Sequence, residues 1–132
     1  MNSFFAMMSR MKYIDRWALM RNSRDENLSE HSLEVSMMAH ALAIIGNTFL
    51  GKELDAQKAA VLGLYHDATE IITGDMPTPI KYYNRQIRQT YREIERGASR
   101  TLLAMLPEQM RSSYLDIFEK KEEDAYLWKL VK

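Results

Sequence analysis

The 132-residue sequence contains no cysteine. This absence excludes disulfide bonds, thiolate metal ligands and a cysteine nucleophile from any account of the fold or the chemistry. A chain that needs no oxidative cross-link is compatible with a reducing compartment. We therefore expect a cytoplasmic protein.

The sequence also lacks an excess of charge of either sign, because Lys plus Arg and Asp plus Glu number 18 each. A balanced chain has no broad positive field to hold a polyanion, so we expect no nucleic-acid polymer as a partner. A local pocket for a single phosphate group remains compatible with this balance.

No apolar stretch is long enough to enter a membrane. The N-terminal segment MNSFFAMMSRMKYIDRW is interrupted by Arg10, Lys12, Asp15 and Arg16 before the core of a signal peptide could form. Elsewhere, no apolar run approaches the roughly 20 residues of a spanning helix. We expect neither secretion by a signal peptide nor a membrane partner.

Alternating strand patterns and internal repeats are absent as well, whereas helical periodicity runs through most of the chain. The clearest helix is expected to begin at Asn27, where N-L-S-E provides a capping box with Glu30, and to end at Ile45 before Gly46. We predict an all-α fold in which residues 1–132 form a single domain.

One face of this helix should point toward the core. Its members recur at steps of four, three, four and three residues: His31, Val35, Met38, Leu42 and Ile45. At roughly 100° per residue, a histidine nine positions later than His31 lies on the opposite face. His40 is therefore not expected to share a site with His31.

A second helix is expected from an N-cap at Asp55 to Thr73–Gly74. It carries AVLGLYHDATEII, in which His66 and Asp67 stand side by side in a mostly apolar run. The loop GDMPTP follows, and its prolines should hold Asp75 in a fixed position. Further helices are expected over residues 80–106, from Pro107 onward, and over the final AYLWKLVK.

The pairing of a histidine with an aspartate suggests a metal site. A lone histidine on an apolar face, such as His31, is often only a hydrogen-bonded core residue. A carboxylate buried beside an imidazole, however, costs several kcal/mol unless a positive group compensates it. We predict a divalent cation held by His31, His66 and Asp67. Two imidazoles and one carboxylate suit Co, Mn, Fe, Zn or Mg and leave positions open for water and substrate.

Three more residues could take part in chemistry. Glu70 shares nearly the same expected helical face as the His-Asp pair and could orient or deprotonate a water molecule. A supporting contact to a ligand, or a surface charge, is the alternative for Glu70. Arg16 suits bidentate contacts to phosphate, and Trp17 offers a flat surface for a base or sugar. A buried tryptophan beside a surface arginine is the alternative for that pair.

The segments N-L-S-E-H-S, Y-H-D-A-T-E and T-G-D-M-P-T-P-I-K-Y occur in a characteristic order and spacing. In these motifs the sequence resembles the HD-domain phosphohydrolases and, among them, the bacterial YfbR-like 5'-deoxynucleotidases, from Phe4 to Lys132. The resemblance implies an all-helical HD-domain bundle that acts as a homodimer. It also implies an enzyme that removes the 5'-phosphate from deoxyribonucleoside 5'-monophosphates with the help of a divalent metal.

The resemblance further implies roles for individual residues. His31, His66 and Asp67 are similar to the metal ligands of the family, and His31 also faces the substrate. Arg16 is similar to the arginine that orients the phosphate, and Trp17 to the aromatic residue that faces the sugar.

Glu70 and Asp75 occupy the positions of the acidic active-site residues, one helping to activate water and the other contacting substrate. The family completes its metal site with an aspartate beyond a segment similar to LWKLVK, whereas this sequence ends at Lys132. We expect a fragment of a longer enzyme. Three protein ligands with water are the alternative.

The predicted enzyme is thus a 5'-deoxynucleotidase, in which a metal-bound water attacks phosphorus, Arg16 neutralises charge and the nucleoside alcohol leaves. A deoxynucleoside triphosphohydrolase is the alternative enzyme, and its product would be triphosphate rather than orthophosphate. A catalytically silent nucleotide-binding or dimerisation module is the alternative outside enzymes. Binding of nucleotide without turnover would identify such a module.

Overall fold

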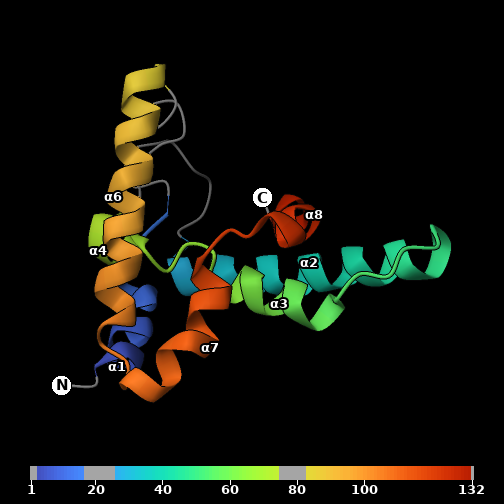
Figure 1. Cartoon of the computed structure of the whole chain (residues 1–132), viewed down its shortest axis with the longest axis horizontal. Coiled ribbons are helices and arrows are strands. Elements are labelled where there is room, and N and C mark those ends of the chain that lie inside the picture. The colour runs from blue at the N-terminus through green and yellow to red at the C-terminus, as the bar shows by residue number, and fades with distance from the viewer. Residues whose placement is uncertain (1–2, 17–25, 75–82, 132) are drawn as a thin grey trace. The chain divides into compact units, whose positions relative to one another are not determined.

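The computed structural model describes residues 3–16, 26–74 and 83–131 (Figure 1). Its elements are α1 (Phe4–Met8), η1 (Ser9–Tyr13), α2 (Leu28–Phe49), α3 (Ala56–Tyr65), α4 (Glu70–Thr73), α6 (Arg85–Leu103), α7 (Glu108–Phe118), η2 (Glu122–Asp124) and α8 (Ala125–Val131). Within these ranges the extended structure amounts to an isolated bridge between Asp15 and Asn27. The predicted all-α class is confirmed.

The chain divides into two compact units, each of which draws on two separate stretches of sequence. The first comprises Met1–Ser29 with Ala68–Arg111, and the second Glu30–Asp67 with Ser112–Lys132. That residues 1–132 form a single domain stays a prediction. In the parts of the chain that are described, no helix is both long and apolar enough to cross a membrane.

In the first unit, α6 packs against α1 and α4. Phe4, Leu102 and Leu106 are fully or almost fully buried in this unit. Helix α6 begins later than predicted, because the side chain of Asn84 accepts a hydrogen bond from the backbone N–H of Ile87 at 2.8 Å and so caps the helix there. It ends at Leu103 rather than at residue 106.

In the second unit, α3 packs against α8. Their common core contains these buried residues of α2, α3 and α8: Ala39, Ala43, Ala59, Leu62, Leu127, Trp128 and Val131. Asp55 caps α3 as predicted, since its carboxylate accepts from the N–H of Lys58 at 2.9 Å. In the same first turn of α3, Lys58 Nζ lies 2.7 Å from Asp124 Oδ2, the residue that precedes α8.

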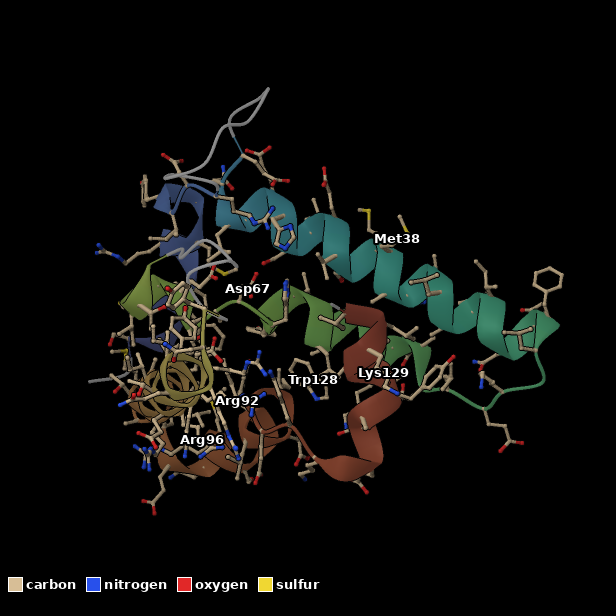
Figure 2. All side chains as sticks on the ribbon, turned by 90° about the horizontal axis from the view of Figure 1, so that it is seen from above. Met38, Asp67, Arg92, Arg96, Trp128 and Lys129 are labelled. Atoms are coloured by element: carbon tan, nitrogen blue, oxygen red, sulfur yellow. The ribbon has the colours of Figure 1, made fainter. Side chains whose placement is uncertain are left out.

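The predicted inward face of α2 is wrong for most of its length. Met38, Leu42 and Ile45 are 61%, 38% and 47% exposed, and Figure 2 shows Met38 on the side of α2 away from α3. From Ser32 onward, the buried stripe consists instead of small residues: Ser32, Ser36, Ala39, Ala43 and Gly46. Small side chains allow a neighbouring backbone to come close, so the packed face of α2 is set by size rather than by hydrophobicity alone.

Two predicted helix boundaries are also wrong. Helix α2 begins at Leu28, directly after Asn27, but it continues through Gly46 to Phe49. The reversal that follows is made at Gly51, which has a φ of 66°. The expected helix from Asp55 to Gly74 is interrupted by a turn at residues 66–69, which separates α3 from the short α4.

Candidate metal centre

Two pieces of the second unit supply the candidate ligands. His31 lies in the first turn of α2, while His66 and Asp67 lie in the turn that follows α3. Within this turn, the carbonyl of Gly63 accepts a hydrogen bond from the His66 ring at 2.7 Å.

The carboxylate of Asp67 faces both imidazoles. Its Oδ2 lies 3.0 Å from His66 Nε2 and 3.6 Å from His31 Nε2. The two rings are 5.2 Å apart between centroids and tilted by 54°. All three side chains are partly exposed, so solvent or a small ligand can reach them.

The donor set fits a divalent cation. One nitrogen or oxygen atom from each of His31, His66 and Asp67 lies within 4.8 Å of the other two. Ligand atoms about 2.1 Å from a tetrahedral ion are about 3.4 Å from one another, which is close to the observed separations from Asp67. Within the described part of the chain, His31, His66 and Asp67 form the group of three histidine or carboxylate side chains that is close enough to hold an ion.

A backbone carbonyl fixes the orientation of the His66 ring. Because a carbonyl oxygen can only accept, the contact with Gly63 requires the proton to be on Nδ1 of the neutral ring. Its Nε2 then carries the lone pair and faces Asp67. A backbone carbonyl that holds one ring nitrogen while the other binds metal is the usual arrangement at such sites.

Tyr65 is a neighbour of the candidate ligands that the sequence analysis missed. Its ring contacts those of Tyr114 and Phe118, with centroids 6.0 Å away in each pair, so it ties the end of α3 to α7. Burial raises the pKa of Tyr65, and Tyr114 raises it further. Tyr65 therefore stays a neutral phenol near neutral pH. Apart from the position of Tyr65 beside His66, nothing in the sequence indicated that its ring packs against α7.

The other predicted site residues lie in the first unit or outside the described residues. Arg16 belongs to the first unit, where its Nη1 donates to Glu26 Oε2 at 2.6 Å. Glu70 also belongs to that unit and is buried, with 4% of its surface exposed. Because the chain turns at residues 66–69, the helical spacing used to relate Glu70 to the His-Asp pair does not hold. Trp17 and Asp75 lie outside the described residues, and His40, which was not expected to share a site with His31, is exposed.

A family model described as "5'-deoxynucleotidase YfbR-like" matches residues 3–132. The chain belongs to the YfbR-like 5'-deoxynucleotidase family. It is 49% identical over 129 residues to a 5'-deoxynucleotidase of Erwinia tasmaniensis, an alignment that covers 98% of this chain and 65% of that protein. It is 52% identical over 126 residues to 5'-deoxynucleotidase YfbR of Salmonella paratyphi B, covering 92% of this chain and 63% of the relative. The chain thus spans less than two thirds of the length of these YfbR-like relatives.

Solved structures agree with the family fold. An HD-domain phosphohydrolase from Listeria innocua superposes with a TM-score of 0.82 at 21% identity, over 98% of this chain and 63% of the other. A conserved hypothetical protein from Pyrococcus furiosus gives a TM-score of 0.71 at 22% identity, covering 98% of this chain and 74% of that one. The predicted HD-domain helical fold is confirmed.

Proposed function

We propose that this chain removes the 5'-phosphate from deoxyribonucleoside 5'-monophosphates. Membership of the YfbR-like family and the names of the relatives support the substrate class and the reaction. The observation that carries the proposal is the convergence of His31, His66 and Asp67 donor atoms within 4.8 Å. In the reaction, water attacks phosphorus, the bond from phosphorus to the 5'-oxygen breaks, and the nucleoside leaves as an alcohol with a proton.

His31, His66 and Asp67 would hold the divalent cation, whether Co, Mn, Fe, Zn or Mg. When bound, the cation lowers the pKa of water, to about 7 for zinc in the best-studied case, and so supplies a nucleophile near neutral pH. Asp67 contributes the negative charge of the ligand set. His66 is held by the Gly63 carbonyl so that its Nε2 is available as a ligand.

The remaining roles rest on motif positions. Arg16 binds the phosphate and offsets charge that develops on it, and its ion pair with Glu26 holds the guanidinium in place before substrate arrives. Trp17 faces the sugar. Glu70 helps to activate water, and Asp75 contacts the substrate together with His31.

The experiment that tests this function compares products. The chain, loaded with Co²⁺ or Mn²⁺, is incubated with a deoxyribonucleoside 5'-monophosphate, the matching ribonucleotide and the matching deoxynucleoside triphosphate. We expect orthophosphate from the deoxy monophosphate and much less from the ribonucleotide. Release of triphosphate would favour the triphosphohydrolase, and binding without any product would favour a silent binding module.

We also propose that the protein works as a cytoplasmic homodimer. The absence of cysteine supports a reducing compartment. The support for a dimer is the outer face of α2, where Met37, Met38, Ile44 and Ile45 are 45–64% exposed. From Val35 to Gly51 the sequence has no Asp, Glu, Lys or Arg, so a second copy could approach this face without opposing like charges.

A further inference from the structure

Helices α2 and α3 touch through their backbones at a single glycine. A Cβ atom on Gly63 would lie 2.7 Å from Ser36 Cα and 2.9 Å from Ser36 N, closer than side-chain atoms approach a backbone. The Ser36 hydroxyl also donates to the carbonyl of Ala60 at 2.8 Å, so the helices are hydrogen-bonded at the same point. Their separation here is set by the missing side chain of Gly63.

This contact is close to the candidate ligands on both helices. Ser36 follows His31 by five residues, about 7.5 Å along the helix axis, and Gly63 precedes His66 by three, about 4.5 Å. An opening of the helices at the contact would therefore move the two imidazoles apart. It would also lengthen the 3.6 Å separation between His31 Nε2 and Asp67 Oδ2, since these atoms come from opposite sides of the contact.

Gly63 acts on His66 in a second way. Its carbonyl oxygen lies 2.7 Å from His66 Nδ1 and fixes which ring nitrogen carries the proton. The residue that sets the distance between the helices thus also orients one ligand, so a displaced Gly63 would disturb both.

We propose that Gly63 is the positioning residue of the metal site, because it holds α3 against α2 and presents Nε2 of His66 to the cation. This inference rests on the metal site proposed above. It gives Gly63 a role beyond packing, because the consequence of a side chain there is a misplaced ligand set rather than only a less stable helix pair.

The test uses Gly63→Ala with two control variants. Gly97→Ala adds the same methyl group to a helix interior where a Cβ would meet no atom within 4 Å, so it should preserve or raise stability. Ser36→Ala removes the hydroxyl hydrogen bond but leaves the backbone contact with Gly63 unchanged. It therefore lowers stability without moving the helices apart.

The variants are measured both without metal and loaded with Co²⁺. In the metal-free chain, the nuclear Overhauser effect between the His31 and His66 rings reports their proximity, and ¹⁵N shifts report the tautomer of His66. In the loaded chain, the visible absorption of Co²⁺ reports affinity and coordination geometry. We expect Gly63→Ala to weaken the ring-to-ring signal, to alter the Co²⁺ spectrum and to weaken Co²⁺ binding about 10-fold. The two control variants should match the unsubstituted chain in the ring-to-ring signal, the Co²⁺ spectrum and the Co²⁺ affinity.

An unchanged ring-to-ring signal and unchanged Co²⁺ affinity in Gly63→Ala would overturn the inference. If the unsubstituted chain binds no Co²⁺, the proposed metal function fails, while the metal-free signals still decide the role of Gly63. If Gly63→Ala does not fold, the ¹⁵N shifts of the unsubstituted chain test the role of Gly63 instead. The proton of neutral His66 must then be on Nδ1, and a proton on Nε2 contradicts the inference.

Discussion

Asp67 is the side chain on which both imidazoles converge, and the sequence identified it by its position next to His66. The sequence argument relied on the cost of burying a carboxylate, but the Asp67 side chain is 26% exposed, which makes that cost smaller than assumed. The convergence of donor atoms is the stronger reason to expect a cation. The orienting role of the Gly63 carbonyl could not be predicted, because backbone acceptors leave no trace in a sequence.

Arg16 gives a prediction at the same scale. Arg16→Ala should lower kcat/KM for a deoxyribonucleoside 5'-monophosphate about 100-fold or more, because the phosphate loses a charge-assisted partner in the transition state. Arg10→Ala, which removes an exposed arginine of η1, is the matched control and should leave kcat/KM unchanged. Steady-state kinetics measure both. Equal activity of Arg16→Ala and the unsubstituted chain would remove Arg16 from the proposed site.

At the level of elements, α2 shows why periodicity found the helix but not its buried face. A stripe scored by hydrophobicity selects Met38, Leu42 and Ile45, whereas close packing against α3 selects small residues such as Ser36 and Ala39. Gly46 was interpreted as a helix end because glycine often follows the last residue of a helix. It is buried in the helix, and a Cβ there would lie 3.1 Å from Leu54 Cδ1, so it serves packing rather than termination.

The break after α3 had a different origin. Nothing in the apolar pattern of residues 60–72 distinguishes one continuous helix from two helices separated by a turn. The turn includes a hydrogen bond from the His66 ring to the Gly63 carbonyl, a contact that the apolar pattern does not encode. By contrast, the start of α2 and the Asp55 cap were predicted correctly, because capping depends on the local sequence alone.

The ion pair between α3 and the start of α8 allows a stability prediction. Asp124 is buried and its partner Lys58 is partly exposed, so Lys58→Met should lower the free energy of unfolding by about 1–3 kcal/mol, less than for a fully buried pair. Lys121, which pairs with Asp116 on the surface, provides the control. Urea unfolding of Lys58→Met and Lys121→Met measures the difference. A loss in Lys121→Met equal to that in Lys58→Met would contradict this account.

At the scale of the whole molecule, the order and spacing of three motifs identified the family and the helical class. The same motifs could not define the two compact units, because each unit is assembled from separate stretches of the chain. The account of the metal rests on the three donors that the structure brings together.

The proposed homodimer makes a second prediction at this scale. If the outer face of α2 is the interface, Met38→Glu should weaken association about 100-fold, because it places a carboxylate in an apolar contact. Ile94→Glu is the control, since Ile94 is 50% exposed and belongs to α6 of the first unit. Sedimentation equilibrium gives the mass of each variant. A monomeric unsubstituted chain, or a Met38→Glu variant that stays dimeric, would contradict the proposed interface.

The central claim is that His31, His66 and Asp67 bind one divalent cation, and elemental analysis after loading with Co²⁺ or Mn²⁺ tests it most directly. We expect about one ion per chain in the unsubstituted protein and in His40→Ala, whose histidine is exposed and outside the cluster. Asp67→Ala should retain almost no metal while circular dichroism shows unchanged helicity. Equal metal content in Asp67→Ala and the unsubstituted chain would contradict the account.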